Sequence, residues 1–147
     1  MRPNVSEQLA GVARILADTV APALVDPYPA DILGGLIATL DALAVSWADV
    51  PAYLAWDAGE TMALLTDASP ALDAEQRGRL ATLAGAPARD PLDLRALEDH
   101  HRAVLELLAD VIAAGPPPDA TPRIAAHLRE RATRFPVVAA QRMPGQR

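Results

Sequence analysis

The sequence has 147 residues, a formal net charge of −6 and no cysteine. This length suits one domain with a real hydrophobic core. The acidic balance, without a basic stripe, argues against nucleic acid and against an anionic membrane surface as partners. The absence of cysteine excludes disulfides, thiolate nucleophiles and cysteine-based zinc sites.

The composition predicts an all-α fold. Apolar residues make up 51% of the chain, but aromatic residues only 3%, and 32 residues are alanine. Small side chains allow helices to approach closely, whereas sheets favour β-branched and aromatic residues. We therefore predict a single domain over residues 1–147, built as an antiparallel bundle of about five to six helices.

Prolines, glycines and capping residues divide the chain into helical segments. Asn4 or Ser6 is expected to cap the first helix, Ser69 the fourth and Thr121 the sixth. The tail after Phe135 is expected to fray. The six predicted helices cover about 5–24, 30–47, 50–66, 70–84, 91–114 and 121–134.

Two glycines, Gly34 and Gly35, lie inside the second predicted helix, where each costs roughly 1 kcal/mol relative to alanine. We interpret them as positions of close packing against a neighbouring helix. The N-terminus alternates polar and apolar residues, unlike a signal peptide. No run approaches the 18 or so apolar residues of a membrane span, so we expect a cytoplasmic protein that has no membrane partner.

The stretch "LEDHHRAVLELL" holds the main candidates for chemistry. In the helix predicted over 91–114, His101 takes a place in the apolar stripe and so points inward, while His100 lies at its shoulder. Glu98 and His101 are three residues apart, the pair that di-iron carboxylate bundles use twice. One such pair does not hold two metals, so a ferritin-like site is excluded.

A site with one divalent metal ion remains an alternative. Asp57 and Glu60 are also three residues apart, on the helix predicted over 50–66. If that helix packs on the one that carries Glu98 and His101, all four side chains converge on one ion or form an acid–base site. They can equally form a buried hydrogen-bonded network, because buried polar groups need partners. We favour the network, with no cofactor and no catalytic residue.

The last predicted helix carries His127 together with Arg129, Arg131 and Arg134. We interpret these residues as a solvated face near a helix C-terminus, where positive charge is favourable. The alternatives are a site for a phosphate-bearing ligand or for an acidic partner surface.

Aromatic residues gather where the second predicted helix meets the third. Tyr53 and Trp56 are three residues apart, and Trp47 lies near them in the sequence. Aromatic side chains dominate binding energy at many interfaces. We therefore expect these three residues at an interface with a protein partner, and we expect self-association as a homodimer.

The segments "RPNVSEQLAGVARILADTVAPAL" and "PRIAAHLRERATRF" resemble a family of small, uncharacterised helical bacterial proteins. Genes of that family stand beside aminoglycoside-phosphotransferase-like kinases and acyl-CoA dehydrogenases. The stretch "SWADVPAYLAWDAGETMALL" departs from the family pattern. The resemblance implies an accessory role beside acyl-CoA or phosphotransfer chemistry, and it supplies no catalytic residues.

Taken together, these patterns predict a non-enzymatic accessory protein that binds a partner. The alternative is a small metal-dependent or acid–base enzyme whose carboxylate and histidine site lies in the bundle core.

Overall fold

The computed structural model describes residues 3–86, 90 and 92–136. The fold is all-α and 85% helical, and the described residues form no strand. The all-α prediction is confirmed. The α-helices of the described part are α1 (Val5–Ile15), α2 (Pro27–Ser46), α3 (Val50–Asp67), α4 (Ala74–Ala84), α5 (Leu94–Ala114) and α6 (Thr121–Arg134).

The described residues divide into two compact units, one made of residues 3–50 with 135–136 and one of residues 51–134. The expectation of a single domain stays a prediction. The tail that was expected to fray lies almost wholly outside the described residues.

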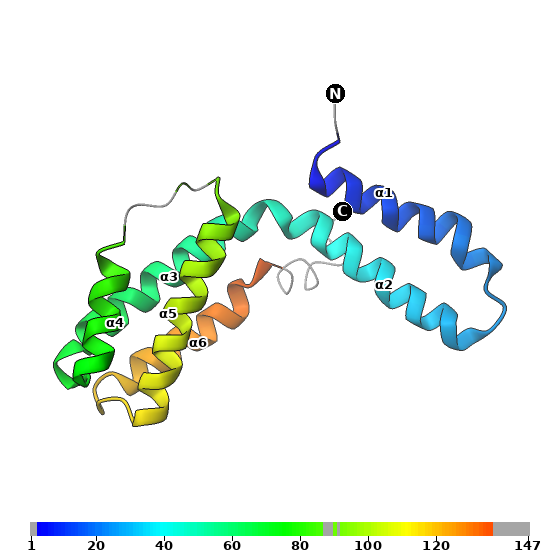
Figure 1. The fold of residues 1–147 in the computed structure, drawn as a ribbon. Coiled ribbons are helices and arrows are strands. Elements are labelled where there is room, and N and C mark those ends of the chain that lie inside the picture. Colours follow the sequence, from blue (N-terminus) through cyan, green and yellow to red (C-terminus); the bar gives the residue numbers. More distant parts are fainter. Residues whose placement is uncertain (1–2, 87–89, 91, 137–147) are drawn as a thin grey trace. The chain divides into compact units, whose positions relative to one another are not determined.

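The first unit is an antiparallel hairpin of α1 and α2 (Figure 1). Asn4 caps α1, and its side chain exchanges hydrogen bonds with Glu7, so the prediction of Asn4 as a cap is confirmed. After Ile15 the helix widens into a π-helical turn, η1 (Leu16–Val20), and ends in a 3₁₀ turn, η2 (Ala21–Ala23), that contains Pro22. The buried residues of α1 and α2 are few: Ala13, Leu33, Ala42 and Ser46.

The two glycines of α2 do not mark close packing. A Cβ atom built on Gly34 or on Gly35 meets no described atom within 4 Å. The interpretation drawn from the sequence is therefore wrong for both positions, since no neighbouring side chain needs the space that glycine leaves.

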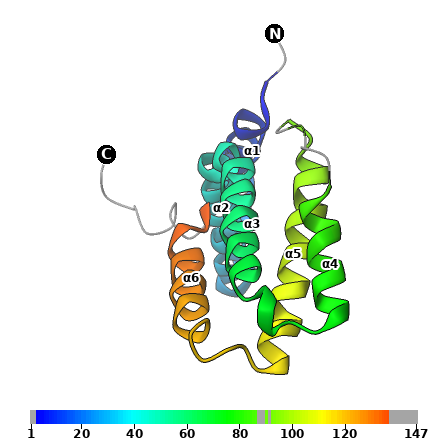
Figure 2. The ribbon, with the colours of Figure 1, turned by 90° about the vertical axis from the view of Figure 1, so that its left-hand side faces the viewer.

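The second unit holds the main hydrophobic core, to which α3, α4, α5 and α6 all contribute (Figure 2). Ser69 does not cap α4, because it lies in a separate 3₁₀ turn, η4 (Ser69–Ala71). The cap is Asp73, whose side chain forms a capping box with Gln76. The buried core cluster consists of Leu65, Leu72, Leu80, Val104, Leu107, Leu108, Val111 and Ile124.

The helical stretch Pro27–Asp67 is long and apolar enough to cross a membrane, judged by length and composition alone. No such stretch was predicted from the sequence. Core helices of soluble proteins pass the same test, so the finding does not place the chain in a membrane.

Candidate functional site

The carboxylate of Asp57 joins three helices in the interior of the second unit. Its side chain is completely buried on α3. Oδ2 accepts hydrogen bonds from Nε2 of His101 on α5 at 2.6 Å and from Nε of Arg131 on α6 at 2.8 Å. A buried carboxylate is tolerated only when it is paired and hydrogen-bonded, and these two partners meet that requirement.

A second imidazole, that of His127 on α6, lies against the other oxygen of Asp57. Nε2 of His127 is 3.0 Å from Oδ1 of Asp57 and 2.9 Å from Oγ1 of Thr61. Oδ1 itself accepts no hydrogen bond of good geometry from the described residues. The contact of His127 with Asp57 is therefore mainly electrostatic. The same Nε2 atom of His127 also forms a hydrogen bond with the hydroxyl of Thr61.

Aromatic rings surround this cluster. The ring of Tyr53 lies 5.9 Å from that of Trp56 and 6.3 Å from that of His101. Trp56 in turn lies 5.7 Å from the ring of His127. Burial raises the pKa of Tyr53, and the negative charge of Asp57 acts in the same direction. The rings thus limit the access of water to the charged groups, which strengthens the interactions between them.

The environment of Asp57 favours its charged form. Burial by itself raises the pKa of this carboxyl group. The hydrogen bond from His101 and the positive charge of Arg131 act against burial and outweigh it, so the pKa lies below its ordinary value of 3.8. Asp57 is therefore an anion at neutral pH, and Arg131 balances its charge.

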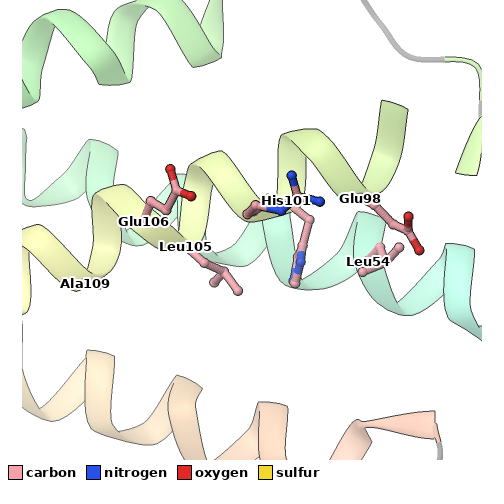
Figure 3. A pocket seen from close by; sticks show the side chains of 7 residues that line it. Leu54, Glu98, His101, Leu105, Glu106 and Ala109 are labelled. Carbon is pink, nitrogen blue, oxygen red and sulfur yellow. The ribbon is translucent and has the colours of Figure 1, made fainter. Parts of the chain in front are cut away.

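An open pocket of about 630 Å³ borders the cluster on the side of His101 (Figure 3). Leu54 of α3 lines it, and the remaining lining residues come from α5. The His101 side chain is 14% exposed, so its imidazole separates the buried Asp57 from this pocket. A histidine held by a carboxylate at the edge of a pocket can take part in proton transfer. The lining residues of α5 are Glu98, His101, Arg102, Leu105, Glu106 and Ala109.

The structure brings together two of the four residues that the sequence placed in one site. Asp57 and His101 meet, as expected if α3 packs on α5. Glu60 is exposed, and Glu98 is exposed at the pocket beside His101. Within the part of the chain that the structure describes, no group of three or more His, Cys, Asp or Glu side chains is arranged to hold a metal ion.

The contribution of α6 to the site was not predicted from the sequence. His127 is buried and Arg131 is 22% exposed, so the interpretation of a solvated face is wrong for these two residues. The interpretation of a solvated face is correct for Arg129, which is exposed. The available signal was spacing, because Ile124, His127 and Arg131 follow one another at intervals of three and four residues, as residues on the buried face of a helix do.

The three aromatic residues expected at an interface do not all belong to the same unit. Tyr53 and Trp56 are half-buried and cover the Asp57 cluster. Trp47 belongs to the first unit and is 37% exposed. The role of these three residues at an interface stays a prediction.

No protein-family model matches the chain, and neither the curated proteins nor the solved structures give a match.

Proposed function

We propose that the protein is a non-enzymatic accessory protein that acts by binding a protein partner. The observation that carries this proposal is the apolar surface of the first unit. Seven large apolar side chains on α1 and α2 are 40% or more exposed, whereas a folded monomer normally buries such residues or scatters them singly. They are Val5, Val12, Ile15, Tyr28, Ile32, Leu36 and Val45.

The spacing of these residues favours a surface that another helix can cover. Val5 and Val12 are two helical turns apart on α1. Tyr28, Ile32 and Leu36 follow at intervals of four residues on α2, so each set forms a stripe along its helix. Amphipathic helices bury such stripes against partner helices.

The contacts of Asp57 support a role without catalysis. Oδ2 already accepts two hydrogen bonds from His101 and Arg131, and Oδ1 faces His127. A carboxylate in this position stabilises the packing of three helices and does not reach a substrate directly.

The proposal is tested by replacing Ile32 and Leu36 together with aspartate. We expect this variant to lose partners that co-purify with the wild-type chain from its native host, and to keep its helical content. Leu92→Asp is the matched control, because Leu92 is 90% exposed in the other unit. Retention of every co-purified partner by the Ile32/Leu36 variant contradicts the proposal.

We also propose that the same surface supports a homodimer. Sedimentation at tens of micromolar is expected to give a dimer for the wild-type chain and a monomer for the Ile32/Leu36 variant. A strictly monomeric wild-type chain contradicts the dimer.

The resemblance described above suggests where a partner is to be sought. We propose acyl-CoA or phosphotransfer metabolism as the setting, and identification of the co-purified proteins tests it. Partners that belong to neither kind of metabolism contradict this part of the proposal.

A second candidate function rests on the 2.6 Å contact between His101 and Asp57 beside a pocket. A small acid–base enzyme can use His101 as the proton-transfer group, with Asp57 to orient and charge-balance the imidazole. In its metal-dependent form, Glu98 and His101 supply ligands from the pocket.

Elemental analysis of protein purified without a tag or chelator tests the metal-dependent form of the enzyme. A stoichiometric metal content that is lost in the His101→Ala variant favours the enzyme over the accessory protein. Metal-free protein whose melting is unchanged by zinc, manganese or iron excludes the metal-dependent form.

A further inference from the structure

The face by which α6 contacts the rest of the second unit is largely polar. Ile124 and His127 are each 6% exposed, and the Arg131 side chain is 22% exposed. Arg134 follows three residues later, with its guanidinium carbon 4.4 Å from the ring centre of Trp56. These four residues follow one another at intervals of three, four and three, as the residues on the contact face of a packed helix do. Ile124 is the one apolar residue among the four.

The other helices of this unit are held differently. The buried core takes Val104, Leu107, Leu108 and Val111 from α5, whereas α6 supplies Ile124 alone. Apolar burial is the dominant favourable contribution to packing, so α6 gains less from it than α5 does. Its attachment depends more on charge and hydrogen bonds, and salt weakens mainly the exposed part of these contacts, such as that of Arg134, whose side chain is 54% exposed.

The surface that receives α6 is suited to guanidinium groups. The buried Asp57 accepts a hydrogen bond from Nε of Arg131, and Trp56 presents a ring to Arg134. Oδ1 of Asp57 is buried, lies 3.0 Å from Nε2 of His127 and accepts no hydrogen bond of good geometry from the described residues. A buried carboxylate next to an indole ring is an arrangement that binds arginine by ion pairing and cation–π contact.

The connection between α5 and α6 is not helical. Gly115 ends α5 at a φ of +88°. Three prolines follow at 116–118. Prolines disfavour helical backbone in the residues that precede them, so the two helices remain separate pieces. Figures 1 and 2 show the chain reversing direction at this point, with α6 returning beside α3.

We propose that the face of α3 around Trp56 and Asp57 is a docking site for an arginine-bearing helix. The chain's own α6 is the resident occupant, and α6 of a second copy can take its place. This site is separate from the apolar surface of α1 and α2, and the inference does not rest on the proposed function.

The test uses a fluorescent synthetic peptide with the sequence of α6 (Thr121–Arg134). It is titrated into the full-length chain and into a variant with both Arg131→Ala and Arg134→Ala. We expect binding to the variant to be tighter by about tenfold or more, because its resident helix competes less well. Adding Asp57→Asn to the variant is expected to abolish this binding.

Two controls isolate the arginines. Arg129 is exposed on the same helix, so the peptide with Arg129→Ala should bind as the wild-type peptide does. The peptide with Arg131→Ala and Arg134→Ala should not bind. The proposal is overturned if the peptide with Arg131→Ala and Arg134→Ala binds as tightly as the wild-type peptide. It is also overturned if the wild-type peptide binds neither the full-length chain nor its Arg131/Arg134 variant.

Hydrogen exchange of the wild-type chain provides a readout that does not depend on the variant's folding. We expect rising sodium chloride to speed amide exchange in α6 and to leave α5 unchanged. Equal protection of both helices at all salt concentrations overturns the proposal that α6 is displaceable.

Discussion

Nε2 of His101 lies 2.6 Å from Oδ2 of Asp57, although the two residues are 44 positions apart in the chain. The contact joins α5 to α3, and Arg131 brings α6 to the same carboxylate oxygen. Asp57 therefore sets the relative positions of three helices, and its removal should affect all of them.

Replacing Asp57 with Asn should lower the free energy of unfolding by about 3 kcal/mol or more, because it leaves the guanidinium of Arg131 without its counter-charge in a partly buried place. Urea denaturation measures the change. Asp67→Asn is the control: Asp67 pairs with Arg123 at a site where both side chains are about half exposed, and such pairs contribute about 1 kcal/mol or less. Equal losses for the two variants contradict the role assigned to Asp57.

The stability of the chain should fall in acid in a way that depends on Asp57. The pKa of this carboxyl group is lower in the folded protein than its ordinary value of 3.8. Its contribution to stability is therefore complete above that value and is lost as the pH falls through the folded-state pKa. Unfolding free energies measured from neutral pH downward should show a smaller acid loss in Asp57→Asn than in the wild-type chain.

His101→Leu should destabilise the protein by about 1–3 kcal/mol, because the new side chain no longer donates a hydrogen bond to Asp57. Added apolar burial offsets part of this loss. Glu98→Gln, a change at an exposed position on the same helix, should leave the melting temperature unchanged. A His101→Leu variant that is more stable than the wild-type chain but no longer supports its native pathway would favour the enzyme instead.

Gly34→Ala and Gly35→Ala should each stabilise the chain by up to about 1 kcal/mol, since alanine is the better helix former. The structure offers no steric obstacle, because a Cβ at either position meets no described atom within 4 Å. Gly115→Ala should have the opposite effect, because a φ of +88° is strained for any residue with a side chain. Thermal unfolding of the three variants checks both signs.

The positions of the helices were largely predictable from local signals. The predicted range of α6 agrees with the structure, and Asn4 caps α1 as expected. Thr121 was wrongly predicted as the cap of α6, because it is the first helical residue and its hydroxyl donates to the carbonyl oxygen of Pro117. The fourth helix was placed too early, because Ser69 and Asp73 are both good caps. Asp73 is used because its side chain and that of Gln76 satisfy each other's backbone donors.

The inward direction of His101 follows from the sequence, because a helix turns by a fixed angle per residue and His101 occupies a place in an apolar stripe. The groups that His101 contacts depend on how the helices pack. Glu60 and Asp57 are equally suitable carboxylates on one helix, but Asp57 faces α5 and α6 while Glu60 faces solvent. The spacing of Ile124, His127 and Arg131 indicates a buried face on α6, but it does not identify the partner of that face, because Asp57 is about seventy residues away.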